Sequence, residues 1–419
     1  MSLRRLLYSA LLFALIPLVL LRLVWRARQQ RGYVRHVGER FGRYSGPPQQ
    51  SVLWVHAVSV GETRAAEPLI RALQAAYPAH RVLLTLMTPT GRQTAEQIFG
   101  NSVLRCQLPY DLPFAIARFV RHYRPMFGVL VETELWPNLI QDCHAAGVPM
   151  LLVNARLSER SAGRYARLGG LTRETLACLA AVGAQTESDA VRLRGLGASQ
   201  VTVTGNLKFD REPTPADLAL GSRLRERCGA RPIFVAASTR AGEEELVLDA
   251  LVSAPSELLT VVVPRHLQRF DEVARILQRR GLPFQRRSED TPVRADTRVL
   301  LGDSMGELFA YYAASDIAFV GGSLLRLGGQ NLLEACATGT PVLIGPHAFN
   351  FAEATRLALE AGAALQVADA NELGAAVRDL LADAPRRERM GAAGLSLMQQ
   401  HQGATQRTLE LLQAVVRRG

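Results

Sequence analysis

The chain has 419 residues, of which 48% are hydrophobic and 21% charged, so it is long enough for two globular domains. Residues 1–44 contain nine arginines and one glutamate, and this segment therefore carries +8 of the net charge of +11. The remaining chain is close to neutral, which argues against a nucleic-acid-binding body. The five cysteines include no Cys-x-x-Cys pair, which fits neither a zinc site nor a disulfide framework and indicates a reducing compartment.

An uncharged, leucine-rich run extends from Leu6 to Leu21, and Trp25 follows where an interfacial aromatic side chain belongs. Counted to Trp25, the run has about the 20 residues that a bilayer span needs, provided that Arg22 reaches toward the headgroups. We therefore predict a membrane anchor over residues 1–28, which either spans the bilayer or lies in its interface. A signal peptide or a buried helix is the alternative. Since positive charge is heavier after the run, the body is expected on the cytoplasmic side.

From residue 49 onward, short apolar runs alternate with helical stretches, the pattern of parallel strands covered on both faces. The predicted strands are Val52–Ala57, Arg81–Met87, Phe127–Glu132, Met150–Asn154, Val201–Thr204, Ile233–Ala237, Leu258–Val263, Arg298–Leu301, Ile317–Val320 and Pro341–Ile344. The proline-containing segment Glu212–Ala216 is the predicted linker between residues 29–212 and 213–419. The last helix is a candidate to pack back on the N-terminal domain. We expect two doubly wound, Rossmann-like α/β domains facing a cleft, with ligands at the carboxyl ends of both sheets.

The first motif is VLWVHAVSVGET, residues 52–63, in which a strand ends and a helix begins. Ser59 and Gly61 turn the chain, and Glu62 lies in the first turn of the helix. Glu62 is either a catalytic carboxylate, with Ser59 and Gly61 letting a substrate approach, or a first-turn residue that complements the helix dipole. In both cases the dipole is expected to keep Glu62 ionised at neutral pH. His56 lies within the apolar strand and is more typical of a satisfied core residue.

Two further motifs follow predicted strands of the first half. VETELWPN, residues 131–138, places Glu132 and Glu134 on one side of an extended chain, so that one of them can face the cleft. GNLKFD, residues 205–210, contains Lys208, the only lysine beside 48 arginines. A chain so biased toward arginine is expected to keep a lysine where a compact charge on a flexible stem is needed. Chance survival of Lys208 is the alternative.

The second half places polar and glycine-rich segments after several strands. These segments are Pro264–His266, Gly302–Glu307, Gly321–Ser323 and Gly328–Glu334. Glycine turns that lead into helices are typical phosphate sites, and Arg265 would add a charge-assisted contact. The chain has no Asp-x-Asp, Walker A or Gly-x-Gly-x-x-Gly motif. We therefore expect no metal ion and no cofactor, with leaving-group charge met by lysine, arginine and helix dipoles.

WVHAVSVGET, VETELWPN, GNLKFD, VPRH and GGQNLLEA, in this order behind an apolar N-terminus and an ERFG segment at 39–42, closely resemble the 3-deoxy-D-manno-octulosonic acid (Kdo) transferases of lipopolysaccharide assembly. The resemblance covers essentially the whole chain. It implies a two-domain GT-B fold, CMP-Kdo as donor, lipid IV-A as acceptor, inverting and metal-independent transfer, and a place at the cell inner membrane. No nucleic acid is implied as a partner.

The resemblance also implies roles for individual residues. Glu62 matches the general base, and Glu132 and Lys208 match residues that stabilise the transition state. The residues that match contacts to the CMP of the donor are Pro264, Arg265, Met305, Gly306, Glu307, Asn331, Leu332, Leu333 and Glu334.

Two departures from the family pattern lie on the donor side. Gln330, Asn331, Leu332, Leu333 and Glu334 stand where the family usually has His-Asn-Pro-Leu-Glu, and Arg240 stands where it often has a histidine. Alternative functions are another membrane-associated GT-B nucleotide-sugar transferase and a non-catalytic anchored binding protein on the same fold. An NAD-dependent dehydrogenase is excluded by the missing dinucleotide motif.

Overall fold

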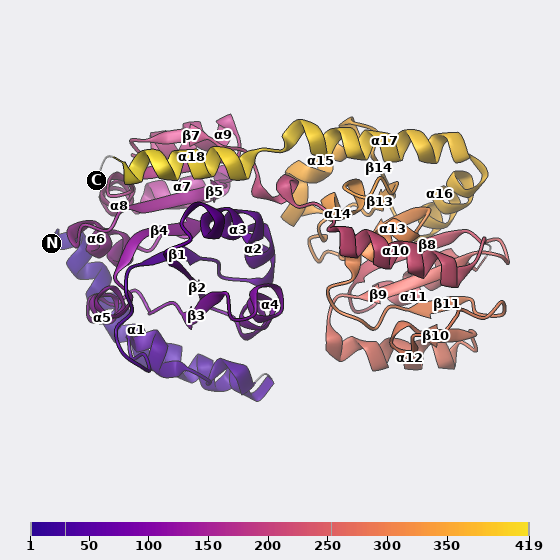
Figure 1. The fold of residues 1–419 in the computed structure, drawn as a ribbon, viewed down its shortest axis with the longest axis horizontal. Coiled ribbons are helices and arrows are strands. Elements are labelled where there is room, and N and C mark those ends of the chain that lie inside the picture. Colours follow the sequence, from indigo (N-terminus) through magenta and orange to yellow (C-terminus); the bar gives the residue numbers. More distant parts are fainter. Residues whose placement is uncertain (1, 30, 253, 418–419) are drawn as a thin grey trace. The chain divides into compact units, whose positions relative to one another are not determined.

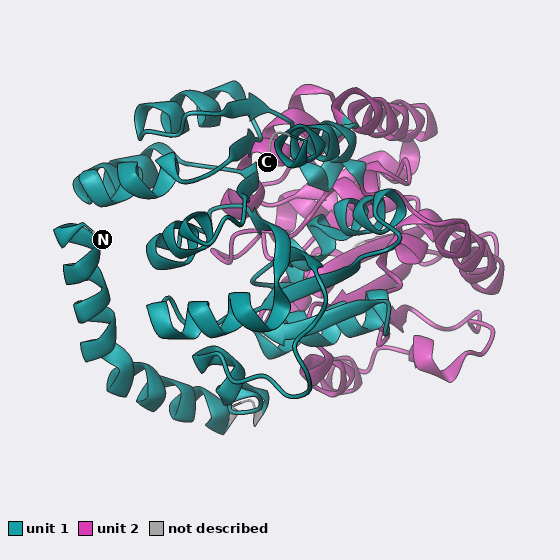
Figure 2. Cartoon of the chain, turned by 60° about the vertical axis from the view of Figure 1, so that its left-hand side comes forward, with its two compact units in different colours: residues 1–210, 402–419 teal, residues 211–401 magenta. Residues whose placement is uncertain are grey.

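The computed structural model describes residues 2–29, 31–252 and 254–417. The chain forms two compact units, which Figure 2 colours separately. Unit 1 comprises residues 1–210 and 402–419, and unit 2 comprises residues 211–401.

Unit 1 is built on a parallel sheet whose strands, among the described residues, run in the order β3-β2-β1-β4-β5-β6-β7 (Figure 1). They are β1 (Val52–His56), β2 (Arg81–Leu86), β3 (Val103–Gln107), β4 (Pro125–Val131), β5 (Met150–Ala155), β6 (Ala181–Ala184) and β7 (Val201–Val203). The strand order reverses between β1 and β4, which pair directly. Doubly wound folds bind ligands at this reversal, beside the carboxyl ends of the strands.

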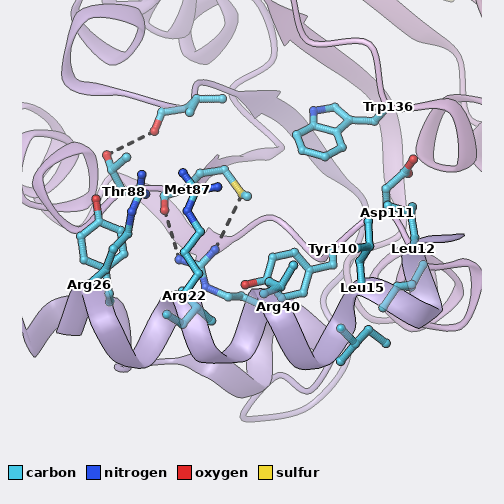
Figure 3. Close-up of a pocket in the computed structure, with 16 residues that line it drawn as sticks. Leu12, Leu15, Arg22, Arg26, Arg40, Met87, Thr88, Tyr110, Asp111 and Trp136 are labelled. Atoms are coloured by element: carbon cyan, nitrogen blue, oxygen red, sulfur yellow. Dashed lines mark hydrogen bonds between the residues drawn. The ribbon is translucent and has the colours of Figure 1, made fainter. Parts of the chain in front are cut away.

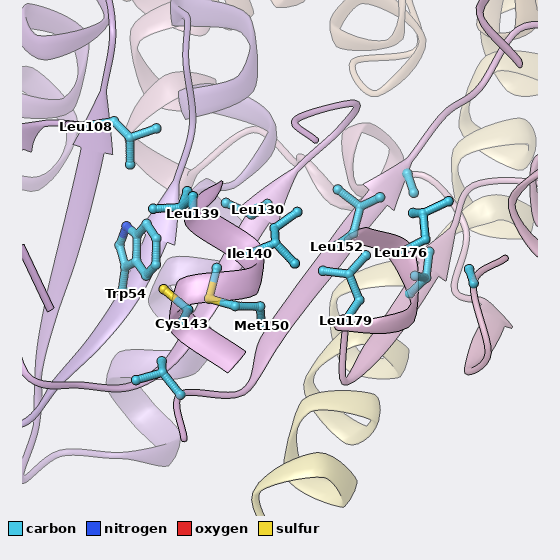
Figure 4. Packing of buried hydrophobic residues seen from close by; sticks show 14 of the residues in the cluster. Trp54, Leu108, Leu130, Leu139, Ile140, Cys143, Met150, Leu152, Leu176 and Leu179 are labelled. Atoms are coloured by element: carbon cyan, nitrogen blue, oxygen red, sulfur yellow. The ribbon is translucent and has the colours of Figure 1, made fainter. Parts of the chain in front are cut away.

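Every residue of β1 is buried, because helices cover both faces of this sheet. Trp54 and Leu130 belong to one apolar cluster with residues of α5 (Pro113–Tyr123), α6 (Pro137–Ala145), α8 (Gly170–Ala177) and α9 (Glu187–Gly195), part of which Figure 4 shows. Leu53 and Val55 belong to the opposite cluster, with residues of α3 (Glu67–Ala76), α4 (Pro89–Phe99) and α18 (Ala404–Val416). The remaining helical elements of unit 1 are α1 (Leu3–Gln29), α2 (Val60–Ala65), α7 (Glu159–Arg167), η1 (Arg31–Tyr33), η2 (Val37–Phe41) and η3 (Leu207–Asp210).

The C-terminal helix α18 returns to unit 1. Asp210, the last residue of the GNLKFD motif, accepts hydrogen bonds from the backbone N–H groups of Gly403 (2.8 Å), Ala404 (3.3 Å) and Thr405. A carboxylate at this place satisfies N–H groups that have no partner within the helix. Leu412 of α18 is fully buried in the core of unit 1. The aspartate of the motif therefore fastens the end of the chain to unit 1.

α1 is one long apolar helix, with a mean hydropathy of 2.3 over its best 18-residue window and only 11% of that window buried. By length and composition it is the one helix among the described residues that could cross a membrane. Figure 2 shows it bent, and Pro17 lies within it, where proline removes one backbone hydrogen bond. Ser9 and Leu23 on its inner side are buried against unit 1.

Unit 2 repeats the architecture with a parallel sheet in the order β10-β11-β9-β8-β12-β13-β14 within the described chain. Its strands are β8 (Ile233–Thr239), β9 (Leu259–Pro264), β10 (Phe284–Arg286), β11 (Val299–Leu301), β12 (Ile317–Val320), β13 (Val342–Ile344) and β14 (Ala364–Gln366). Its helices are α10 (Pro215–Cys228), α11 (Glu243–Ala250), α12 (Phe270–Arg279), α13 (Leu308–Ala314), α14 (Leu333–Cys336), α15 (Ala352–Glu360), α16 (Ala370–Ala382), α17 (Ala384–His401) and the short turns η4 (Leu267–Arg269), η5 (Arg287–Glu289) and η6 (Phe349–Phe351).

The predicted α/β fold class is confirmed, with two parallel sheets and an apolar N-terminal helix. Four strands were not predicted, namely β3, β6, β10 and β14. Three of these are edge strands, and β6 lies next to an edge. Edge strands are less enclosed, so their residues include Arg105, Arg286 and Gln366 instead of a continuous β-branched run.

Candidate functional site

Glu62 lies at the reversal point of unit 1, in the first turn of α2, which directly follows β1. Ser59 is the N-cap of α2, and its hydroxyl donates a hydrogen bond to the Glu62 carboxylate (2.9 Å). The backbone N–H of Val58 donates a second one (2.7 Å). Apart from its chain neighbours and the helix backbone, a Cβ atom at Gly61 would have only the Ser59 hydroxyl within 4 Å, at 3.9 Å, so there is room for a ligand at Gly61.

The pKa of Glu62 is raised to about 7. Burial is the largest cause, followed by the negative charge of Glu132, and the hydrogen bonds from Val58 and Ser59 oppose both. The expectation that the helix dipole keeps Glu62 fully ionised at neutral pH is therefore wrong. Burial and a second carboxylate outweigh the local donors, and the group is poised to take up or release a proton near pH 7.

Glu132 and Lys208 form an ion pair at 2.8 Å, with most of both side chains buried. Glu132 follows β4 and adopts a left-handed φ of 66°, which is uncommon for a residue other than glycine. Lys208 lies on η3, where its backbone N–H bonds to the Asn206 side chain (3.0 Å). The GNLKFD motif thus delivers Lys208 to the carboxylate beside Glu62.

Glu134 lies in a different environment from Glu132. The chain turns at Glu132 and does not continue as a strand, so the two side chains have different neighbours. Its carboxylate accepts a hydrogen bond from the Trp136 indole (2.7 Å) and lies 3.9 Å from Nε2 of His56. Burial raises the pKa of Glu134 to about 7 and lowers that of His56 to about 4. His56 is fully buried, as predicted, and its Nδ1 is hydrogen-bonded to Thr85, but its Nε2 is buried without a hydrogen-bond partner, so the prediction of a satisfied core residue is only half right.

At the reversal point of unit 2, between β8 and β12, a buried carboxylate occupies the glycine turn. Glu243, in the first turn of α11, accepts hydrogen bonds from the backbone N–H groups of Gly322 (2.5 Å), Leu324 (3.1 Å) and Arg240 (3.0 Å). Gly321 lies so close to Ser238 that a Cβ atom there would be 2.7 Å from its carbonyl oxygen. The N–H groups of Gly322 and Leu324 already have a protein partner, which argues against these two amides as donors to a phosphate.

Cationic side chains gather near the end of β9. Pro264 is the buried last residue of the strand, and the Nε of Arg265 donates to the Gln330 side chain (3.1 Å). Burial, together with the charges of Arg240, Arg265 and Arg269, lowers the pKa of His266. Gln330, one of the two departures from the family pattern, thus orients an arginine.

The other predicted donor residues lie in two loops of unit 2. Met305 is partly exposed, Gly306 has a φ of 88° with open space where a Cβ would lie, and Glu307 accepts a hydrogen bond from Ser304 (2.7 Å). Around α14, Asn331 caps the N–H of Leu333 (3.2 Å).

Leu332 and Leu333 are buried as whole residues, backbone included, so neither presents a surface to a ligand in this structure. Glu334 forms a buried ion pair with Arg211, whose guanidinium stacks over Phe309 at 5.1 Å. One carboxylate oxygen of Glu334, Oε2, is buried without a hydrogen-bond partner.

Sequence reasoning missed the two partners that define these loops, Glu243 and Arg211. Glu243 is the first of three successive glutamates that follow the Ser-Thr-Arg turn, and Arg211 directly follows GNLKFD. The position of Glu243 at the start of a helix after a strand is the signal that could have identified it. In the described part of the chain, no group of three or more His, Cys, Asp or Glu side chains is arranged to hold a metal ion.

The family model of the 3-deoxy-D-manno-octulosonic-acid transferases (kdotransferase) matches residues 35–211, and that of the glycosyl transferases group 1 matches residues 281–396. The chain is 45% identical to the 3-deoxy-D-manno-octulosonic acid transferase of Bordetella pertussis, covering 97% of this chain and 98% of that protein. The chain belongs to the 3-deoxy-D-manno-octulosonic acid transferase family. It is accordingly a glycosyltransferase. The enzyme of the same name from Haemophilus influenzae is 40% identical, with 99% of both chains covered.

The fold is also similar to a solved structure outside the family. UDP-GlcNAc 2-epimerase from Neisseria meningitidis superposes with a TM-score of 0.58 at 17% identity, covering 87% of this chain and 100% of that one. This likeness concerns the fold alone and agrees with two GT-B-like α/β units.

Proposed function

We propose that this transferase moves Kdo from CMP-Kdo to lipid IV-A with inversion at the anomeric carbon and without a metal ion. Membership of the Kdo transferase family supports the donor sugar. The observation that carries the mechanism is a carboxylate with a pKa of about 7, Glu62, at the reversal point of unit 1 beside the Glu132–Lys208 pair.

Glu62 is the proposed general base. A hydroxyl oxygen of the acceptor attacks the anomeric carbon of Kdo, and the bond from that carbon to the phosphate oxygen of CMP breaks, so that CMP leaves with the electron pair. The hydroxyl proton passes to the Glu62 carboxylate. A base is most effective when its pKa is near the working pH, which fits a value of about 7. The open space at Gly61 leaves room for the acceptor.

Lys208 and Glu132 are proposed to act as a unit. Glu132 holds the ammonium group of Lys208 at 2.8 Å, and its negative charge raises the pKa of Glu62. Lys208 thereby offers a positioned positive charge to the transition state, while Glu132 makes Glu62 more basic.

The donor nucleotide is proposed to bind unit 2. Arg265, oriented by Gln330, supplies a cation for the CMP phosphate. The proposed contacts to the rest of the nucleotide are Pro264, Met305–Glu307 and Asn331–Glu334. The N–H groups of Gly321 and Gly322 have no part in this proposal, because they already bond to the Ala237 carbonyl and the Glu243 carboxylate.

α1 is proposed to attach the enzyme to the inner membrane with its body on the cytoplasmic side. Removal of residues 1–28 should transfer the protein to the soluble fraction with the fold of both units kept, so that the circular dichroism spectrum loses only the helical signal of α1. A truncated protein that still sediments with membranes in high salt would contradict an anchor confined to α1.

The direct test of the proposed function is transfer with defined substrates. Purified full-length protein should convert lipid IV-A and CMP-Kdo to a product heavier by one or more Kdo units, detected by mass spectrometry. UDP-GlcNAc in place of CMP-Kdo should give no product. Product formation from UDP-GlcNAc alone would instead favour a different nucleotide-sugar transferase.

A further inference from the structure

A cavity of about 400 Å³ lies between α1 and the body of unit 1 (Figure 3). Its α1 wall is mostly apolar, and the body adds further apolar side chains. The apolar lining residues are Leu12, Leu15, Ile16, Val19, Leu23, Val58, Met87, Leu112 and Trp136. The volume is in the range of small-molecule sites, and an apolar lining of this extent favours a hydrocarbon ligand.

One end of the cavity is cationic. Figure 3 shows Arg22, Arg26 and Arg40 gathered near Thr88. Arg40 is only 3% exposed, and its Nε is buried without a hydrogen-bond partner. Arg40 donates to the carbonyl oxygen of Met87 (3.1 Å), and among the described residues no carboxylate forms a salt bridge with any of these three arginines. A buried, incompletely satisfied guanidinium is costly unless an anion completes its contacts.

The opposite end holds the one acidic lining residue, Asp111, near Leu12 and Trp136 (Figure 3). Its carboxylate accepts hydrogen bonds from Tyr8 (2.8 Å) and from the backbone N–H groups of Asn138 (3.1 Å) and Leu139 (2.7 Å). Two of these donors lie on α6 and the third, Tyr8, lies on α1, and all three hold Asp111 at the end of the cavity opposite the arginines.

The helix α1 is held along unit 1 at both ends. Near its start, Arg5 donates to the Asn138 side chain (2.8 Å) and pairs with Asp142. Near its end, Leu23 is buried and Arg26 stacks over Tyr33 at 5.3 Å. A helix fastened at both ends lies along the body and closes the cavity as one of its walls.

The outer side of α1 is apolar and exposed. Apart from Leu15, which borders the cavity, its exposed large hydrophobic residues are Leu3, Leu6, Leu7, Leu11, Phe13, Leu18, Leu20, Leu21, Val24 and Trp25. A helix with this composition that lies along its domain fits the plane of a membrane surface, with the outer side among the acyl chains. The cavity behind α1 is then next to the lipid.

We propose that this cavity binds an anionic lipid, with an acyl chain along the inner side of α1 and an anionic headgroup on Arg22, Arg26 and Arg40. The orientation follows from the positions of the two ends. At the cationic end, the hydroxyl of Thr88 donates to the carbonyl oxygen of Val58 (3.3 Å). The backbone N–H of the same residue, Val58, donates to the Glu62 carboxylate. The headgroup therefore lies beside the proposed base. This inference rests on the proposed function in identifying the bound lipid with the acceptor.

Quenching of Trp136 fluorescence tests the cavity. Trp54 is fully buried in the core, whereas Trp25 is exposed on the outer side of α1 and would respond to any lipid. The full-length Trp25→Phe protein is therefore added to phosphatidylcholine vesicles that contain phosphatidic acid with brominated chains. Brominated phosphatidylcholine at the same fraction and inorganic phosphate form the other arms.

We expect brominated phosphatidic acid to quench the fluorescence at a mole fraction at least about fivefold lower than brominated phosphatidylcholine requires. The quenching should be lost in Trp136→Phe. Arg40→Gln, and separately the double variant Arg22→Gln with Arg26→Gln, should raise the fraction needed by about tenfold, the scale of one charge-assisted hydrogen bond. Arg43→Gln is the matched control, because Arg43 is exposed and outside the cavity lining. The double variant keeps the test valid if Arg40→Gln perturbs folding.

Equal quenching by both lipids, or quenching that all arginine variants retain, would overturn the proposal. So would vesicle binding by co-flotation without quenching of Trp136. If millimolar inorganic phosphate abolished the quenching by phosphatidic acid, the arginines would form a site for a free anion and not for a lipid. The assay contains no CMP-Kdo and measures no turnover. A negative result therefore says nothing about the transferase activity, which is tested separately by the mass of the product.

Discussion

Both units place a glutamate in the first turn of the helix that follows the central strand, yet the two carboxylates differ in their partners. Glu243 in unit 2 is fully buried and accepts hydrogen bonds from three backbone N–H groups, two of them on a distant loop. Glu62 in unit 1 has one backbone and one hydroxyl donor, both within four residues, and a second carboxylate nearby. The same position in a doubly wound unit thus holds loops together in unit 2, whereas in unit 1 we propose that it serves proton transfer.

The largest effect is expected from Glu62→Gln, which keeps the shape of the side chain but cannot accept a proton. We expect kcat for Kdo transfer to fall by about 10²–10⁴-fold, with CMP affinity and circular dichroism unchanged. Glu159→Gln is the matched control, since Glu159 lies in the first turn of α7 and is 89% exposed. Turnover within a few-fold of the parent enzyme would move the base elsewhere, with Glu134 or Glu132 as the next candidate.

Lys208 distinguishes a positioned charge from an accident of composition. Lys208→Ala should lower kcat by about 10²–10³-fold, the scale of a lost transition-state donor. Lys208→Arg should be nearly as damaging, because a guanidinium cannot occupy the place of the ammonium group 2.8 Å from Glu132 without shifting it. Steady-state kinetics give the answer, and near-normal turnover of the arginine variant contradicts the proposed role.

Glu243 should affect stability, in contrast to Glu62. Glu243→Ala leaves three backbone N–H groups without their acceptor, and we expect a loss of about 3 kcal/mol or more in the free energy of unfolding. Glu245→Ala, on the exposed side of the same helical turn, should change it by less than about 0.5 kcal/mol. Urea denaturation measures both. Equal stability of the two variants would remove the distinction between the units.

The smallest effects concern the donor. Arg265→Ala should weaken CMP binding by about 1.5–3 kcal/mol in calorimetry, as for a hydrogen bond to a charged group. Unchanged affinity would exclude Arg265 from the donor site.

Addition of EDTA should leave turnover unchanged, and a strict requirement for a divalent ion would contradict the metal-free mechanism.

The fold could be predicted largely from strand patterns, because central strands buried on both faces need continuous apolar runs. Those of β1, β4 and β8 were therefore recognised. The edge strands β10 and β14 each have three residues and include polar ones, so nothing in their sequence separates them from loops. Nothing in the sequence around Asp210 indicates its partner, although Asp210 binds the start of α18, nearly 200 residues later in the chain.

The motifs indicated Glu62, Glu132 and Lys208, but their electrostatics could not be derived from sequence. The raised pKa of Glu62 depends on its burial and on Glu132, which a left-handed turn brings close. The carboxylate that binds two amides of the glycine turn of unit 2 could not be predicted for a related reason. That carboxylate belongs to Glu243, which is 79 residues earlier in the chain, and no local pattern connects the two.

The pH dependence of kcat tests the central claim, that Glu62 is a base whose pKa is raised by burial and Glu132. Since only the ionised carboxylate accepts a proton, kcat should fall about tenfold per unit as the pH decreases below about 7. Glu134 also has a pKa of about 7, so Glu134→Gln is the control and should keep the acidic limb. The residual activity of Glu62→Gln should lose it. A profile of the parent enzyme that stays flat down to pH 5, or an acidic limb that persists in Glu62→Gln, would contradict the account.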